Sequence, residues 1–446
     1  MKILHYSLGL PPYRTGGLTK FATDLMKQQI REKNEVCLLW PGRMSVLNKK
    51  ISIKERKMKY GIVNYEVINP EPVPLDEGII KPVCFMRKGN YQVYRNFIAK
   101  LKPDVLHIHT FMGMHLELLI AAKEEKVRII FTAHDFYPIC SKVTLYTNGE
   151  ICNSAYNCLD CPSCNATALS LKKIFFLQSR LYQQLKDTVI VKKIRKNHRD
   201  KYLGQEKEKK GKIRDVQPSE YKQLRQFYNS YFYYIDVVHY NSLLTKQIYE
   251  NYLSIKCKSV IIPITHSDVK DHKHKKNFSD QLKITYLGPK SKGKGFYLLK
   301  EVLDQEWHKG KRNFLLNIFF ELDESSSYIK QHNRYSYSQL PEILEKTDVV
   351  VAPSIFYETF GYTVLEALSY GVPVIISNNV GAKDIVLSKC GWIFEAGNES
   401  QLSKVFEDIS KEKLEEANTA IIEKIEILTE TEMNMRIFEK CYKENS

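Results

Sequence analysis

Short apolar runs alternate along the chain with longer stretches whose apolar residues recur at helical spacing. Residues 2–7, 35–39, 104–109 and 128–132 are such runs, and 18–32 is the first helical stretch. Apolar runs of this length, rich in valine, isoleucine and leucine, are typical of parallel strands that are buried on both faces. The alternation therefore predicts α/β units in which helices cover a parallel sheet.

The same alternation resumes at 283–288, beyond a polar run over 266–280 that is rich in lysine and histidine. We expect that run to be an interdomain linker. A chain of 446 residues is long enough for two hydrophobic cores. The pattern predicts two Rossmann-like domains, over 1–265 and 266–430, followed by a helix over 431–446.

The stretch 348–376 carries the most specific chemistry. An apolar strand over 348–352 leads through a turn into a helix over 362–369, and a second strand follows over 374–376. A helix start presents unpaired backbone N–H groups and the positive end of the helix dipole, which favour an anion such as phosphate. Here the helix start comprises Phe360, Gly361, Tyr362 and Thr363.

Two carboxylates flank this helix start. Glu358 precedes it and Glu366 lies within the helix. Carboxylate oxygens accept hydrogen bonds from hydroxyl groups, so a sugar and a ribose are natural partners. The alternative is an ordinary strand-to-helix turn with two solvated glutamates.

The net charge of +16 predicts an anionic partner, such as nucleic acid, an anionic membrane face or a phosphorylated substrate. Most of the excess lies in 166–226, where 17 lysines and arginines stand against six acidic residues. Apolar residues over 171–185 recur at helical spacing beside these lysines, as in an interfacial membrane helix. The alternative is a solvated insertion that packs on the first domain. We expect no nucleic-acid partner, because no recognition motif accompanies the charge.

No apolar stretch approaches the roughly 20 residues that a membrane-spanning helix needs, and residues 1–5 run directly into a strand. We therefore expect a cytoplasmic protein that contacts the inner face of the membrane peripherally through 166–226.

Five of the ten cysteines lie close together in the sequence, within the first domain's insertion at 140–226. They are Cys140, Cys152, Cys158, Cys161 and Cys164. The x2 spacings of the last three suit thiolate ligands of zinc or an iron–sulfur cluster, although zinc sites usually pair two separated Cys-x2-Cys arms. Reduced thiols are the default expectation, with no cofactor, and a structural metal is the alternative.

The segment Glu358-Thr-Phe-Gly-Tyr-Thr-Val-Leu-Glu-Ala resembles the Glu-x7-Glu signature of the retaining glycosyltransferases of family four. That resemblance implies the GT-B fold, in which two Rossmann-like domains enclose a cleft. It implies that the first domain lies on the acceptor side, that the second binds the nucleotide sugar, and that the final helix crosses back to the first domain. Glu358 would contact the donor sugar, and Glu366 would bind the ribose of the nucleotide.

The resemblance extends to other loops of the predicted cleft. The glycine pair at 16–17 matches a family loop that faces the donor, which implicates Gly17. Thr132-Ala-His-Asp resembles the strand-end His-Asp of the family, which implicates His134 in catalysis. His109, also at a strand end, is as readily a structural histidine.

Gly288 and Lys294 match the family's glycine and lysine at the diphosphate, but Pro289 stands where the family has an arginine. Lys290 or Lys292 would supply charge without the two-pronged geometry of arginine. This departure predicts an unusual donor site.

Together these residues predict a retaining glycosyltransferase that moves a hexose from a UDP or GDP sugar to a saccharide acceptor, lipid-linked, in surface polysaccharide or glycan biosynthesis. The sequence has no Asp-x-Asp pattern, so we expect no catalytic metal. Two alternatives remain open. One is a sugar-nucleotide epimerase of the same fold, and the other is a catalytically inactive basic adaptor for membranes or nucleic acid, which Pro289 would explain.

Overall fold

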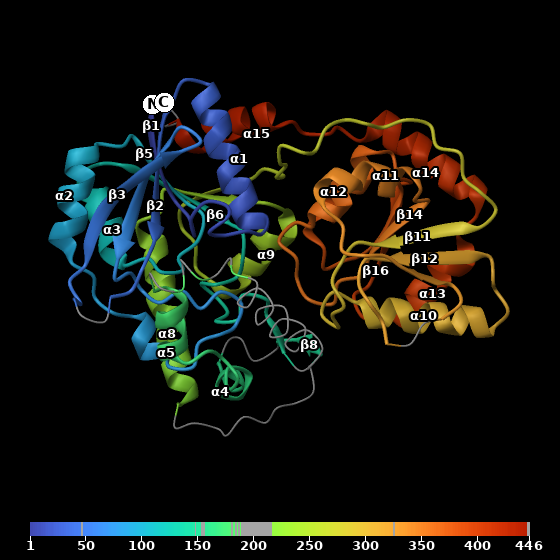
Figure 1. Ribbon diagram of the computed structural model, residues 1–446, viewed down its shortest axis with the longest axis horizontal. Coiled ribbons are helices and arrows are strands. Elements are labelled where there is room, and N and C mark those ends of the chain that lie inside the picture. The colour runs from blue at the N-terminus through green and yellow to red at the C-terminus, as the bar shows by residue number, and fades with distance from the viewer. Residues whose placement is uncertain are drawn as a thin grey trace.

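The chain folds into two α/β lobes that lie side by side, as the computed structural model shows (Figure 1). The structure describes residues 1–45, 48–147, 149–152, 157–179, 182, 185, 188, 216–323 and 326–443. Each lobe is built on one sheet, and both chain ends lie at the first lobe (Figure 1). The predicted α/β class with two parallel sheets is confirmed.

The first lobe has an eight-stranded sheet with the strand order β10-β9-β6-β5-β1-β2-β4-β3. Its strands are β1 (Lys2–Tyr6), β2 (Glu35–Pro41), β3 (Ser52–Lys59), β4 (Ile62–Ile68), β5 (Val105–Ile108), β6 (Arg128–Ala133), β9 (Val237–Tyr240) and β10 (Lys258–Ile261). All of its neighbouring strands pair in parallel except β3, which is antiparallel to β4 at one edge. The polar sequence of β3, SIKERKMK, gave no buried-strand signal, because charged side chains rather than burial protect an edge strand from wrong pairing.

The second lobe has a six-stranded, entirely parallel sheet with the order β13-β12-β11-β14-β15-β16. Its strands are β11 (Leu282–Tyr286), β12 (Phe314–Ile318), β13 (Ile329–Gln331), β14 (Val349–Ala352), β15 (Val374–Ser377) and β16 (Gly391–Phe394). Its helices are α10 (Phe296–His308), α11 (Leu340–Glu345), α12 (Tyr362–Ser369), α13 (Glu399–Asp408) and α14 (Lys411–Lys424). The helix predicted over 362–369 is thus present with those bounds.

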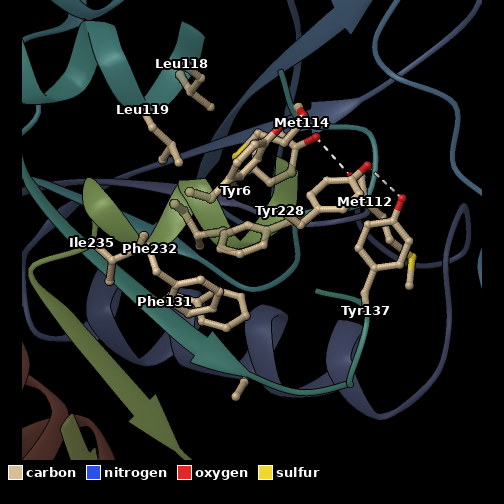
Figure 2. Close-up of a cluster of buried hydrophobic side chains, with 14 of the residues drawn as sticks. Tyr6, Met112, Met114, Leu118, Leu119, Phe131, Tyr137, Tyr228, Phe232 and Ile235 are labelled. Carbon is tan, nitrogen blue, oxygen red and sulfur yellow. Dashed lines mark hydrogen bonds between the residues drawn. The ribbon is translucent and has the colours of Figure 1, made fainter. Parts of the chain in front are cut away.

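The first lobe's helices are α1 (Gly17–Arg31), α2 (Tyr91–Leu101), α3 (Leu116–Glu124), α5 (Leu171–Leu177), α8 (Pro218–Ser230) and α9 (Leu243–Tyr252). Figure 2 shows part of the core beneath them, where tyrosines pack with their hydroxyl groups satisfied. The hydroxyls of Tyr137 and Tyr228 lie 2.9 Å apart, and Tyr6 donates to the carbonyl oxygen of Met112 at 3.1 Å. Buried tyrosines need such partners, because an unpaired polar group in a core is costly.

The insertion at 140–226 begins with a small hairpin, β7 (Tyr146–Thr147) and β8 (Glu150–Ile151), and a helical turn, α4 (Cys161–Cys164). Its two described ends pack on the first lobe. Ile174 of α5 is buried in the core, and the Tyr221 hydroxyl of α8 donates to the carbonyl oxygen of Ile79 at 2.7 Å. These ends therefore have the packing role of the insertion hypothesis, whereas the basic run 192–212 lies outside the described residues.

After α14 the chain returns to the first lobe as α15 (Glu430–Ile437) and the π-helical turn Phe438–Tyr442 (Figure 1). Arg128 at the start of β6 donates to the carbonyl oxygen of Cys441 at 2.6 Å, and Gln29 of α1 donates to the Tyr442 hydroxyl at 3.0 Å. The final segment is therefore an integral part of the first lobe's packing.

The polar run 266–280, predicted as a linker, does connect the lobes, but it is not solvated throughout. His266 is 1% exposed, and the ammonium group of Lys276 donates to the carbonyl oxygens of Leu344 and Glu345. The buried polar side chains of this run have hydrogen-bond partners, as buried polar groups need.

Within the described part of the chain, every helix is too short or too polar to cross a membrane.

Candidate active site

A cavity of about 420 Å³ opens between the lobes. Its walls are loops that follow the carboxyl ends of β1, β6 and β9 in the first lobe and of β11 and β14 in the second. Parallel α/β sheets bind their ligands at this edge. The lining includes nine of the ten predicted site residues: Gly17, His134, Gly288, Lys294, Glu358, Phe360, Gly361, Tyr362 and Thr363. Glu366 is the exception.

The two lobes are joined by hydrogen bonds at Thr359, in the middle of the site. Its side-chain hydroxyl donates to the carbonyl oxygen of His134 at 3.1 Å. Its own carbonyl oxygen accepts from the hydroxyls of Ser242 and Thr245 at the start of α9, both at 2.8 Å. These contacts fix the loop carrying Glu358 against the loop carrying His134, which sequence reasoning had connected only by resemblance.

Glu358 forms an ion pair with Lys294. The Lys294 ammonium nitrogen lies 2.8 Å from Oε2 of Glu358 and 4.9 Å from the centre of the Phe356 ring. The Glu358 side chain is 16% exposed and the Lys294 side chain 31%, so solvent screens the pair only partly. Among the described residues that line this cavity, Lys294 is the single lysine or arginine, and the carboxylate of Glu358 partly offsets its charge.

The start of α12 faces the same cavity. Gly361 is its N-cap residue, with φ 106°, and no side chain caps the helix. A Cβ atom on Gly361 would lie 2.7 Å from Cγ1 of Val380, so the tight turn requires glycine. Across the cleft, Gly17 approaches the Tyr362 ring, because a Cβ atom there would lie 3.4 Å from it. The uncapped helix start is thus available to an anion within a narrow slot.

The loop after β11 is shaped by Tyr286. Its hydroxyl donates to the carbonyl oxygen of Pro289 at 2.9 Å and also lies 3.3 Å from that of Lys294. Pro289 lines the cavity, whereas Lys290 lies 3.5 Å from Asp323 in an ion pair and Lys292 is exposed. Neither of these two lysines lines the cavity.

Glu366 is held behind the cavity by a histidine that sequence reasoning assigned to the linker. Nε2 of His266 lies 3.1 Å from Oε1 of Glu366, and the two side chains are 1% and 4% exposed. The backbone N–H of Asp268 donates to Nδ1 of His266 at 3.3 Å, so Nε2 carries the proton and donates to the carboxylate. The only sequence signal for His266 was its position after the last strand of the first lobe.

His134 is half-buried and belongs to a cluster of five histidines. The other four are buried, and they are His5, His107, His109 and His239. Nε2 of His134 lies 3.3 Å from Nδ1 of His109, and Nε2 of His109 lies 2.9 Å from Nδ1 of His5. From His5 the hydrogen bonds continue through Gln29 and Tyr442 to His107, then through Thr132 to His239.

Burial keeps these imidazoles neutral. It lowers the pKa of His134 and that of neighbouring rings: the pKa is about 3 for His134 and about 4 for His5 and His239. For His107 and His109, burial first and the neighbouring histidines second hold the pKa well below its usual value. Each ring therefore has one N–H donor and one acceptor nitrogen at neutral pH.

The directions of these hydrogen bonds then determine which ring nitrogen of each histidine carries the proton. Nε2 of His239 faces the carbonyl oxygen of Ile262 at 2.8 Å, which only accepts. Nδ1 of His239 must therefore accept from Thr132, which in turn accepts from Nε2 of His107. The same reasoning proceeds through Tyr442, Gln29, His5 and His109 and ends at His134 with its proton on Nε2.

His134 consequently presents an unprotonated Nδ1, whose neighbour at 3.5 Å is the amide nitrogen of Asn241. Asn241 also lines the cavity, and its buried Oδ1 atom has no hydrogen-bond partner among the described residues. A buried acceptor without a partner is costly unless a ligand or water supplies a donor. The first-lobe wall can therefore accept hydrogen bonds from hydroxyl groups, whereas its histidine is too weak a base to remove their protons at neutral pH.

The two-lobe arrangement is shared with solved glycosyltransferases. A glycosyltransferase from Rickettsia africae ESF-5 is 14% identical, with 100% of this chain and 99% of that chain covered and a TM-score of 0.57. A sucrose-phosphate synthase from Thermosynechococcus elongatus is 11% identical, with 98% and 97% covered and a TM-score of 0.56. HepE of Anabaena in complex with UDP is 12% identical, with 98% and 99% covered and a TM-score of 0.54. At these identities the likeness defines the fold, which is GT-B.

Sequence comparison identifies the family. Residues 268–426 match the family described as "Glycosyl transferases group 1", and residues 15–163 match "Glycosyltransferase Family 4", so the two matches together span more than half of the chain. The chain belongs to the family 4 glycosyltransferases. An uncharacterized 42.6 kDa protein in the cps region of Klebsiella pneumoniae is 24% identical over 294 residues, which is 65% of this chain and 60% of that relative's length.

Proposed function

We propose that this protein is a retaining, metal-independent hexosyltransferase that moves a hexose from a UDP or GDP sugar to a saccharide acceptor. The observation that carries the proposal is the Lys294–Glu358 pair beside the uncapped start of α12, facing His134 and Asn241 across one cavity. Positive potential lies on the second-lobe side, and hydrogen-bond acceptors lie on both sides. Such a cavity suits a diphosphate joined to a sugar.

The chemistry follows from where charge develops. Cleavage of the bond between the sugar and the diphosphate leaves negative charge on the departing phosphate oxygen, and preorganised donors that stabilise this charge lower the barrier. Lys294 and the N–H groups at the start of α12 would provide that stabilisation, so no metal is needed for it. Glu358 and His134 Nδ1 would orient sugar hydroxyls, and Glu366, aligned by His266, would bind the ribose.

The comparisons favour a UDP sugar as the first donor to test. HepE of Anabaena has been solved with UDP-glucose, and a trehalose-6-phosphate protein from E. coli has been solved with UDP-2-fluoro glucose. The experiment is a thermal-shift screen of UDP and GDP sugars, since a ligand that binds the folded state raises Tm by mass action. The donor found in this way is then incubated with oligosaccharide and lipid-linked saccharide acceptors.

Release of the nucleotide diphosphate only in the presence of an acceptor would support transfer. Conversion of the nucleotide sugar into its epimer without an acceptor would instead identify a sugar-nucleotide epimerase of this fold. No Tm shift with any nucleotide sugar would contradict the proposal and favour the inactive adaptor.

The proposed lipid-linked acceptor, surface-polysaccharide role and cytoplasmic, membrane-peripheral location rest on the basic segment 166–226. On its described part, Lys172 and Lys173 of α5 are exposed, and Phe176 is 51% exposed beside them. Deleting the whole segment would remove buried residues of α5 and α8. We therefore choose glutamine in place of the lysines and arginines of 192–212, and expect less sedimentation with anionic vesicles at unchanged Tm. Unchanged sedimentation would exclude membrane binding through this run.

A further inference from the structure

Four cysteines of the insertion line a second cavity, close to the first-lobe wall of the interlobe cavity. The cavity measures about 20 Å³. Its lining includes Cys140, Cys152, Cys161 and Cys164, and the fifth cysteine of the group, Cys158, does not line it. A space of this size holds a single ion or water molecule rather than a larger cluster.

The four cysteines come from two parts of the insertion that other contacts already hold together. Cys152 donates its backbone N–H to the carbonyl oxygen of Leu145 at 2.8 Å, which places the end of β8 beside the loop that starts at Cys140. On the other side, Nδ2 of Asn165 donates to the carbonyl oxygen of Cys161 at 2.8 Å, and Oδ1 of Asn165 accepts from the backbone N–H of Ile79. Cys161-x2-Cys164 is thus anchored to the first lobe.

Hydrogen-bond donors and a cation lie beside these cysteines. The backbone N–H groups of Lys142 and Leu145 form hydrogen bonds to the Cys140 sulfur. Arg225 of α8 also lines the cavity and is fixed by donating to the carbonyl oxygen of Ile139 at 2.8 Å. Four thiolates around a divalent cation carry a net charge of −2, which the Arg225 guanidinium partly offsets.

We propose that Cys140, Cys152, Cys161 and Cys164 bind one Zn²⁺ ion that fixes the first-lobe wall of the interlobe cavity. Four sulfur ligands in tetrahedral geometry are the donor set of structural zinc sites. Among the described residues, His5, His107 and His109 are the group whose ligand atoms lie within 4.8 Å of one another. Zinc must therefore draw the four cysteine sulfurs closer together. The three histidines are poor candidates, because their ring nitrogens are engaged in the hydrogen bonds described above.

The backbone between the first two ligands explains why a clamp is needed. Val143 and Leu145 have φ values of 60° and 51°, in the left-handed region that β-branched and bulky residues rarely adopt. Val143 and Thr144 line the interlobe cavity, and the Tyr146 ring lies 6.0 Å from that of Phe356 in the second lobe. Strained backbone at a site persists only where its surroundings hold it. Zinc bound at Cys140 and Cys152 would hold both ends of this strained wall.

The test is the metal content of the full chain, purified without chelators and measured by inductively coupled plasma mass spectrometry. We expect one zinc per chain, and less than about a fifth of that in Cys161→Ser/Cys164→Ser. The matched control is Cys257→Ala, which removes a cysteine outside the insertion that does not line this cavity, and it should keep its zinc. Because the serine variant could misfold, wild type is also loaded with Co²⁺, which should give thiolate-to-cobalt charge-transfer absorption that stoichiometric Zn²⁺ abolishes.

Two results would overturn the proposal. One is metal-free wild type that also gives no thiolate-to-cobalt absorption after reduction. The other is a mass four units below that of the reduced chain, which would show two disulfides in place of a metal site. Neither measurement depends on glycosyl transfer, so the zinc proposal can be refuted while the proposed function stands.

Discussion

The Nε2 atom of His134 lies 3.3 Å from Nδ1 of His109, so the cavity histidine is the last member of a buried hydrogen-bonded series. Because the series starts at a carbonyl oxygen, we predict that all five clustered histidines carry their proton on Nε2 at pH 7.5. Nuclear magnetic resonance of protein labelled with ¹⁵N-histidine distinguishes the two tautomers by the chemical shifts of the ring nitrogens. A His134 ring protonated on Nδ1 would contradict the assignment.

Tyr442 connects the two halves of this series, so Tyr442→Phe should affect both stability and catalysis. The variant leaves the Gln29 amide donor and Nδ1 of His107 without partners, which should lower the free energy of unfolding by about 1–3 kcal/mol. We also expect the fall in kcat to be a larger factor than any change in the KM of the donor, because the orientation of His134 is loosened. Urea denaturation and steady-state kinetics measure the two effects.

Tyr94→Phe is the matched control for that variant. The Tyr94 hydroxyl also contacts a buried histidine, Nδ1 of His115 at 2.7 Å, but that pair is remote from the cavity lining. The control should lose similar stability and keep its kcat. Equal loss of kcat in both variants would show that Tyr442 acts through stability alone.

Glu358→Ala should reduce transfer by about 100-fold or more, since it removes a proposed transition-state contact at the sugar. It also leaves Lys294 without its partner 2.8 Å away, so binding of free UDP should not weaken. Turnover with the donor and calorimetric titration with UDP measure these effects. Glu342→Ala, which breaks an exposed glutamate–lysine pair, is the control. Undiminished turnover in Glu358→Ala would remove this residue from the site.

Lys294→Ala should weaken UDP binding by roughly 10- to 100-fold, because a hydrogen bond to a charged group contributes about 1.5–3 kcal/mol. Pro289→Arg, which introduces the family's arginine at a cavity-lining position, should strengthen it. The Tyr286 hydroxyl binds the carbonyl oxygen of residue 289, a contact that the substitution retains. Lys346→Ala, at an exposed pair, should leave the affinity unchanged. Unaltered affinity in Lys294→Ala would place the diphosphate elsewhere.

Stability should fall between pH 7.5 and pH 5.5. The clustered histidines have lowered pKa values in the folded protein, so the unfolded chain takes up protons there that the folded chain does not. Each such proton costs about 1.4 kcal/mol per pH unit below roughly pH 6.5, where unfolded histidine titrates. Burial raises the pKa of Glu71 to about 8 and of Asp135 to about 6, which opposes the effect by at most two protons.

The net effect is therefore loss of stability on acidification, measurable as the urea midpoint at the two pH values. Variants His5→Gln and His239→Gln should each have a shallower pH dependence. A midpoint that is unchanged or higher at pH 5.5 would show that the buried histidines are not neutral.

The fold could be predicted from the sequence wherever apolar periodicity was strong. Residues 349–352 and 362–369 read as a buried strand and a helix because packing and local pattern agree there. The charged edge strand β3 was not predicted, because its polar residues give no buried-strand signal. Contacts between residues distant in sequence, such as that of Tyr221 with Ile79, were not predicted either. The same limit applied to His266, whose partner Glu366 lies 100 residues away.

For the site, the sequence motifs identified residues that line the cavity, but not the hydrogen bonds that position them. Nothing near His134 in the sequence indicates Tyr442, and nothing near Glu358 indicates that Thr359 joins the lobes. The spacing of residues within a loop indicates which side chains that loop presents. Hydrogen bonds between the lobes form only once the sheets are assembled, so residue spacing does not indicate them.

The placement of Tyr442 among the histidines of the first lobe has a consequence for biosynthesis. Domains generally fold in the order in which the ribosome releases them. Here Tyr442 is translated after the second lobe. Gln29 and His107 of the first lobe therefore lack this hydrogen-bond partner until the second lobe has been translated and the final turn packs on the first lobe. Nascent chains halted anywhere before residue 442 should therefore be more sensitive to protease in their first half than the released protein.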